Sequence, residues 1–190
     1  EIAQCLVGSE MCIRDRTYSM EIEVPFNATL QILVENMGRI NYGSEIVHNT
    51  KGIISPVQIA GKEIVGGWDM YQLPMDEMPD LTKLKADTHK NVPSEVAKLK
   101  GCPVLYEGTF TLDKVGDTFM DMESWGKGIV FVNGVNIGRY WKVGPQQTLY
   151  IPGVWLKKGE NKIVIFEQLN ETPQTEVKTV KTPVLMKLKG

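Results

Sequence analysis

An Asn-Gly pair between two apolar runs constrains the fold of this 190-residue chain more than any other feature. Asn133 and Gly134 separate residues 129–132 from residues 135–137. The two central positions of a tight hairpin turn need positive φ angles, which Asn and Gly adopt at little cost. The pair therefore predicts a two-stranded antiparallel ribbon that turns at residues 133–134.

The turn also predicts the register of this ribbon. In a two-residue hairpin, Val132 faces Val135 across the turn. The same register places Val130 opposite Ile137, so these four aliphatic side chains share one face, which must be buried. Gly138 belongs to the reverse face, where its missing side chain leaves room for a larger neighbour. Five aromatic and basic residues are expected to cluster at the open end of the ribbon: Trp125, Lys127, Arg139, Tyr140 and Trp141.

The chain around the ribbon continues in short strands separated by turns. Residues 104–112 alternate between apolar and polar side chains, as a half-buried strand does. Further strands are expected at residues 118–122, 148–151, 162–166 and 183–187. Residues 170–182 are expected to be a polar connection. This spacing predicts an all-β fold, an antiparallel jelly-roll β-sandwich that spans residues 67–190.

The N-terminal third of the chain predicts a different organisation. Residues 17–66, with a strand expected at residues 30–34, contain too few strands to close a sandwich. We expect them to be the last strands of a truncated second β-sandwich. Residues 10–16 match the translation of a transposon end that is used to prepare sequencing libraries. Residues 1–16 are therefore expected to be a non-native leader, with an ordinary unstructured terminus as the alternative.

Charge and composition exclude several classes of function. The 21 basic and 23 acidic residues are interspersed and give a net charge of -2, which offers no broad field for nucleic acid or an anionic membrane. No apolar run approaches the roughly 20 residues that a membrane-spanning helix needs. The three cysteines lack metal-binding spacing, and His48 and His89 lie far apart in the sequence. No metal site, no cofactor and no membrane span are therefore expected.

Two long segments resemble one enzyme family. Trp-Gly-Lys-Gly at residues 125–128 leads into the ribbon, and Ile-Gly-Arg-Tyr-Trp follows its turn at residues 137–141. With Gly-Pro-Gln-Gln-Thr-Leu-Tyr-Ile-Pro at residues 144–152, this order resembles the C-terminal galactose-binding-like domain of β-galactosidases of glycoside hydrolase family 35. Upstream, residues 33–43 and 51–53 resemble the accessory β-domain that precedes it in that family.

The resemblance implies a non-catalytic role for this chain. A retaining glycosidase needs two carboxyl groups about 5 Å apart. In the family they belong to an N-terminal (β/α)8 barrel, which the strand pattern here does not contain. The expected function is that of a C-terminal fragment, without catalytic residues, of a β-galactosidase that hydrolyses terminal β-galactosyl residues. The implied partner is the barrel of the same polypeptide, with a galactoside as a candidate ligand, and the implied location is secreted or periplasmic.

Two other functions stay open: a stand-alone carbohydrate-binding module, and a structural sandwich of a larger secreted protein. Sugar binding needs an aromatic face and planar hydrogen-bonding groups. Six residues offer these types: Trp125, Lys127, Asn133, Arg139, Tyr140 and Trp141. The alternative for them is a structural role, with Arg139 stacked on Trp125 or Tyr140. Structural or interdomain roles are also expected for Arg39, Asn41 and Tyr42.

Overall fold

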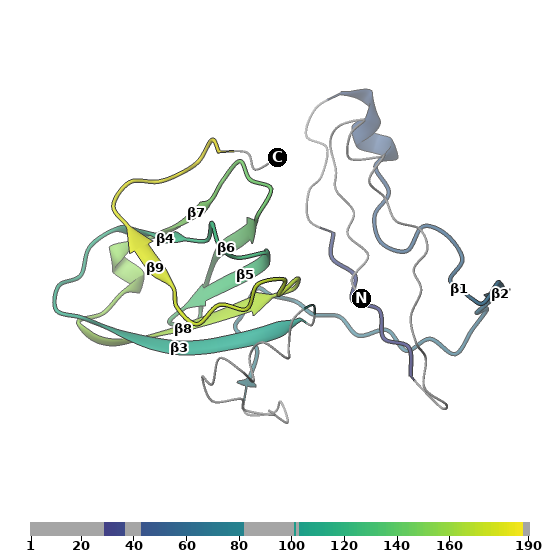
Figure 1. The fold of residues 1–190 in the computed structure, drawn as a ribbon, viewed down its shortest axis with the longest axis horizontal. Coiled ribbons are helices and arrows are strands. Elements are labelled where there is room, and N and C mark those ends of the chain that lie inside the picture. The colour runs from purple at the N-terminus through teal and green to yellow at the C-terminus, as the bar shows by residue number, and fades with distance from the viewer. Residues whose placement is uncertain (1–28, 37–42, 82–100, 102, 188–190) are drawn as a thin grey trace. The chain divides into compact units, whose positions relative to one another are not determined.

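The computed structural model describes residues 29–36, 43–81, 101 and 103–187. The chain divides into two compact units with the boundary between Tyr71 and Gln72. Within the described ranges the regular elements are β-strands and short 3-10 helices (Figure 1). The predicted all-β class is therefore confirmed, whereas the domain bounds inferred from the sequence stay predictions.

The described part of the first unit contains little regular structure. It holds the 3-10 helix η1 (Ser44–His48) and an antiparallel pair of very short strands, β1 (Gln58–Ile59) and β2 (Lys62–Glu63). Residues 29–36 are described and hold no strand assignment, so the strand expected at residues 30–34 is not found in the described part of the chain. Outside the described residues lie the expected leader at residues 1–16 and Arg39, Asn41 and Tyr42.

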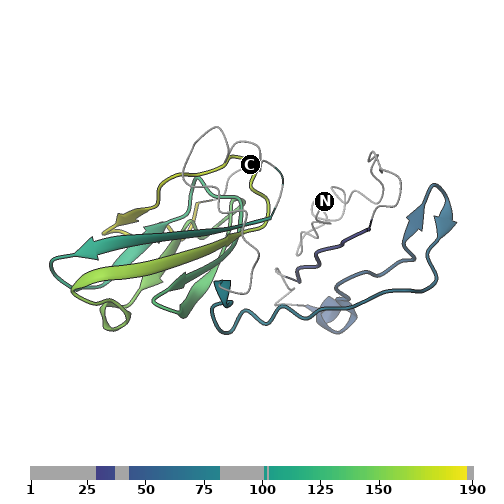
Figure 2. The ribbon, with the colours of Figure 1, turned by 90° about the horizontal axis from the view of Figure 1, so that it is seen from below.

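Strands β3 to β9 build the second unit as two antiparallel sheets. The larger sheet contains, in spatial order, β3 (Val104–Leu112), β8 (Gly159–Glu167), β5 (Lys127–Val132) and β6 (Val135–Trp141). The smaller sheet contains β7 (Thr148–Ile151), β4 (Thr118–Asp121) and β9 (Lys178–Val180). The 3-10 helix η4 (Gly153–Trp155) follows β7. The long strands β3 and β8 run side by side in Figure 1 and in Figure 2.

The main hydrophobic core lies between these two sheets. Val130 and Val132 of β5 are fully buried and belong to the same cluster as Met120 of β4 and Ile151 of β7. Ile137 of β6 packs against this cluster. The two sheets therefore form a β-sandwich. Of the predicted inner face of the ribbon, Val130, Val132 and Ile137 line its core.

The outer face of β5 is covered as well. Phe131 of β5 and Val164 of β8 form a second buried cluster, against which Met75 and Met78 pack. The side-chain amide of Asn136 holds this covering segment by donating to the Met75 carbonyl at 2.6 Å. Because both faces are covered, every residue of β5 is buried.

The register predicted for the ribbon holds next to the turn and is wrong beyond it. Val130 pairs with Gly138, not with Ile137. Ile137 is the extra residue of a β-bulge, in which the Gly138 N–H donates to the Asn136 side-chain oxygen at 2.8 Å. Gly138 has a φ of 130°, which glycine adopts far more readily than other residues. The bulge shifts all pairs toward the open end by one residue.

The last strand also differs from the prediction. It is β9, which lies within the segment expected to be a connection and pairs with β4. Residues 183–187 form no strand, although the Gln147 N–H donates to the Val184 carbonyl at 2.8 Å. Pro183 has no backbone N–H to contribute to a ladder, and the Val184 N–H donates to the Thr148 hydroxyl at 3.0 Å instead of to a backbone carbonyl.

Candidate functional site

The open end of the ribbon brings together aromatic and basic residues, as predicted. Because of the bulge, Lys127 pairs with Trp141, and its Nζ atom lies 4.5 Å from the centre of the Trp141 ring. The rings of Trp125 and Tyr140 meet edge-on with their centres 6.3 Å apart. Arg139 precedes Tyr140 on β6 and is exposed. The cation–π contact at this end thus joins Lys127 to Trp141.

The carboxylate of Glu167 lies at the centre of this cluster. It is 2% exposed at the end of β8 and accepts five hydrogen bonds. Oε2 accepts from the Gly126 N–H at 2.8 Å and from the Tyr140 hydroxyl at 3.1 Å. Oε1 accepts at 2.9, 3.0 and 3.2 Å from the backbone N–H groups of Leu169, Lys127 and Asn170. These donors compensate the cost of burying a carboxylate.

Burial favours a structural role for most of the residues that were candidates for sugar binding. Lys127 is 1% exposed, and Trp125 and Tyr140 belong to the main core. Trp125 is held by a second edge-on contact with Tyr106, with ring centres 5.2 Å apart. A sugar ring packs on an aromatic face that is open to solvent. These side chains instead support the end of the sandwich around Glu167.

The expectation that Asn133 shares this neighbourhood is wrong. Asn133 lies in the turn, at the other end of β5, with a φ of 50° beside Gly134 with a φ of 87°. Its side-chain amide donates to the Trp155 carbonyl at 2.7 Å and to the Asn161 side-chain oxygen at 2.8 Å, and its oxygen accepts from the Lys162 N–H. Asn133 therefore ties the turn to the start of β8.

The buried phenol of Tyr140 predicts a loss of stability at alkaline pH. Burial, and then the charge of Glu167, raise the pKa of Tyr140 far above its ordinary value of 10.0. Its contribution is therefore complete below pH 10 and is lost as the pH rises further, because only the unfolded chain then releases the proton. Urea unfolding across this pH range should show a weaker alkaline decline for Tyr140→Phe. A decline as steep as that of the wild type would contradict this role.

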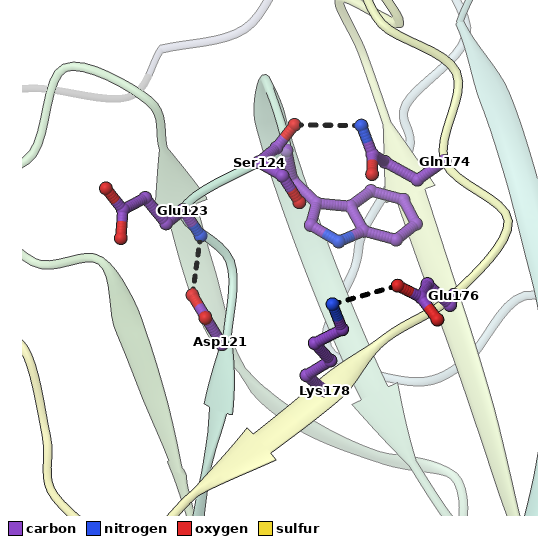
Figure 3. Close-up of a pocket in the computed structure, with 7 residues that line it drawn as sticks. Asp121, Glu123, Ser124, Gln174, Glu176 and Lys178 are labelled. Atoms are coloured by element: carbon purple, nitrogen blue, oxygen red, sulfur yellow. Dashed lines mark hydrogen bonds and ion pairs between the residues drawn. The ribbon is translucent and has the colours of Figure 1, made fainter.

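A pocket of about 400 Å³ lies beside the cluster. It is lined by Asp121, Glu123, Ser124, Trp125, Gln174, Glu176 and Lys178 (Figure 3). These residues come from the end of β4, from the loop after it, and from a segment that enters β9. Of them, the sequence had indicated only Trp125. Ser124 and Gln174 are 50 positions apart yet joined by a hydrogen bond of 3.1 Å, and no local sequence pattern reports such a contact.

The described residues offer no metal site. Among them, no group of three or more histidine, cysteine or acidic side chains could hold a metal ion. Within the same ranges, no helix has the length and apolar character needed to cross a membrane. The expected absence of a metal and a cofactor stays a prediction.

Comparisons with known proteins match both parts of the chain. The family model for the β-galactosidase galactose-binding domain matches residues 103–161, and the model for the first all-beta domain of β-galactosidase matches residues 4–74. Beta-galactosidase 1 of Dictyostelium discoideum is 37% identical over 87% of this chain and 25% of its own length. Beta-galactosidase 17 of Arabidopsis thaliana is 41% identical, and human Beta-galactosidase-1-like protein 3 is 39% identical; each match covers 82% of this chain and 23% of the relative.

The fold and these matches define a galactose-binding-type β-sandwich that follows another β-domain. The chain belongs to the β-galactosidase family, so the resemblance found in the sequence is confirmed. It spans about a quarter of the length of the curated relatives that it matches. The matched parts are the non-catalytic accessory domains of β-galactosidases.

Proposed function

We propose that this chain is the non-catalytic C-terminal part of a β-galactosidase that hydrolyses terminal β-galactosyl residues, and that its sandwich braces the (β/α)8 catalytic barrel. The main supporting observation is the network around Glu167. There, the Glu167 carboxylate accepts five hydrogen bonds and holds the end of β8 to the start of β5. Aromatic side chains of the main core pack beside it. A site arranged in this way rigidifies a domain, since its polar groups are already satisfied.

A rim of exposed apolar residues supports contact with the barrel. This apolar rim consists of Val115, Tyr150, Val154 and Trp155. Asp117 organises it, because its carboxylate accepts from the Tyr150 hydroxyl at 2.7 Å and from the Gly153 N–H at 2.8 Å. Val154 is 87% exposed. Such apolar surfaces mark interaction sites, and in the relatives about three quarters of the polypeptide lies beyond the matched region.

The bracing role is tested by placing a charge in the apolar rim of the complete parent protein. We expect Val154→Asp to shorten the half-life of β-galactosidase activity at elevated temperature several-fold, because it disrupts an apolar interface. Met186→Asp is the matched control, since Met186 is 88% exposed and lies outside the rim. Equal half-lives for the two variants would contradict bracing through this surface. In the 190-residue chain alone, Val154→Asp should leave the urea midpoint unchanged.

The same proposal predicts that the isolated chain does not hydrolyse β-galactosides. A retaining mechanism needs one carboxylate as nucleophile and another as acid/base, both open to the substrate. Glu167 is buried and satisfied, and Glu123 pairs with Lys187. Incubation with a chromogenic β-galactoside should release no product above the background. Turnover that increases with the concentration of purified chain would contradict the proposal.

A further inference from the structure

We propose that the outer edge of β3 pairs with the β3 edge of a second copy of this chain, so that the large sheets of two copies join into one. Among the strands that the structure describes, β3 pairs with β8 alone. In Figure 1, β3 lies on the side of β8 that faces away from β5. Its other side therefore presents a row of backbone N–H and C=O groups that can pair with a further strand.

The edge of β3 lacks the features that usually prevent such pairing. Its nine residues pair with β8 without a register shift and contain no proline, lysine or arginine. The opposite edge of the same sheet is interrupted, because β6 carries the bulge at Ile137 and a bridge from Val135 to Glu77. In the smaller sheet, the outer strands β7 and β9 have only four and three residues. Of the described strands, β3 thus offers the edge best suited to another strand.

The hydrogen bonds of β8 determine which backbone groups of β3 face outward. The Asn133 N–H donates to the Lys162 carbonyl at 2.9 Å, so Lys162 directs its backbone groups away from β3, toward the side of β5. Successive residues of a strand direct these groups to opposite sides. Ile163 therefore directs its own toward β3, where its partner is Gly108. The same alternation leaves the backbone groups of four residues on the open side of β3: Leu105, Glu107, Thr109 and Thr111.

A two-fold axis at Gly108 brings these groups into register with those of the second copy. Glu107 then faces Thr109 of the second copy, and Leu105 faces Thr111. Because all four residues direct their backbone groups outward, each facing pair exchanges both of its N–H to C=O hydrogen bonds. Glu107 is the one charged residue of β3, and it meets a hydroxyl group instead of another carboxylate, so this register avoids like charges opposite each other.

The same register covers apolar side chains of the main core. Tyr106, Phe110 and Leu112 pack against that core but are only partly buried. Across the axis, Tyr106 faces Phe110 of the second copy and Val104 faces Leu112. Aromatic and aliphatic pairs across strands stabilise a sheet. Since both the backbone groups and the side chains of β3 complement themselves about this axis, the partner that fits is a second copy of this chain.

Sedimentation velocity of the 190-residue chain tests the proposal. We expect a dimer that forms at high protein concentration and dissociates on dilution, because one strand pair buries less than the roughly 1,200 Å² of a standard interface. Thr109→Pro removes an N–H that faces the second copy, at an edge position where a folded sheet tolerates proline. This variant should sediment as a monomer at concentrations where the wild type is a dimer.

Thr109→Glu and Thr109→Lys are a matched pair that tests the register without removing a backbone group. Thr109 is exposed, so both variants should fold. In the dimer, the first places a carboxylate opposite Glu107 of the second copy, twice, and should raise the Kd about tenfold. The second places an ammonium group there and should dimerise at least as well as the wild type. Thermal unfolding of the monomers separates these effects from that of Lys162, which faces Thr109 within each copy.

Amide hydrogen exchange identifies the paired edge, since the four outward-facing amides of β3 should gain protection as the concentration rises. The proposal is overturned if the wild type sediments as a monomer throughout, if the dimer survives Thr109→Pro, or if the two charged variants dimerise equally. Should Thr109→Pro fail to fold, the charged variants decide. Protection of the same amides in the monomer would mean that another part of the chain covers the edge, and would also contradict the proposal. None of these outcomes bears on bracing, which the Val154→Asp experiment tests separately.

Discussion

Glu167→Gln is expected to destabilise the second unit by roughly 2 to 5 kcal/mol. The glutamine amide can replace only one carboxylate oxygen as an acceptor. If its NH2 group takes the place of Oε2, it faces the Gly126 N–H and the Tyr140 hydroxyl, which now donate to Glu167 at 2.8 and 3.1 Å. The opposite orientation is worse, because Oε1 accepts from three backbone N–H groups. Either way, buried donors lose their acceptor.

Urea unfolding followed by tryptophan fluorescence measures this loss. Glu160→Gln provides the control: Glu160 is exposed on the same strand, so its substitution should change stability by less than about 0.5 kcal/mol. A Glu167→Gln chain as stable as the control would mean that the five hydrogen bonds do not hold the open end of the ribbon together.

Among substitutions of a glycine by alanine in this sandwich, Gly128→Ala is expected to lower the free energy of unfolding most. A Cβ at this position would lie 1.8 Å from the Phe166 carbonyl oxygen and 2.6 Å from the Tyr140 hydroxyl. The backbone has little freedom to move away, because Gly128 pairs with Tyr140 on one side and with Glu167 on the other. We expect a loss of more than about 3 kcal/mol, or no folded protein at all.

Gly108→Ala is the control for this substitution. Gly108 lies in β3 of the same sheet, and an added Cβ would meet Ile163 at an ordinary 3.6 Å. Its substitution should therefore cost little, and the midpoint of thermal unfolding should stay near that of the wild type. Similar stabilities for the two alanine variants would contradict the close packing of β5 against β8 and β6.

Local sequence signals were sufficient for most strands of the second unit. The alternation at residues 104–112 predicted β3, and the Asn-Gly turn predicted the hairpin of β5 and β6. Both signals depend on neighbours a few positions apart. The bulge at Ile137 carried a local signal as well, since an isolated glycine within a strand indicates one. An interpretation of Gly138 only as room for a neighbouring side chain misses the bulge, and the predicted register is therefore wrong beyond it.

The arrangement of the site could not be predicted in the same way. Residue types indicated a cluster of Trp125, Lys127 and Tyr140, but not its burial, which results from packing on both faces of β5. The role of Glu167 depends on donors that lie up to 41 positions away in the sequence. The pocket likewise combines the loop after β4 with residues 174–178. Such contacts follow from the tertiary fold and leave no periodic pattern in the sequence.

The genomic sequence upstream of Thr17 tests most directly the claim that this chain is the supporting part of a larger hydrolase. We predict an in-frame coding region for a (β/α)8 barrel with two catalytic carboxylates, joined to residue 17 without the segment at residues 10–16. The match to the first all-beta domain begins at residue 4 and so overlaps the expected leader at residues 1–16. The same genomic sequence decides whether those residues are native. A native start codon near residue 17, with no such barrel ahead of it, would contradict the account.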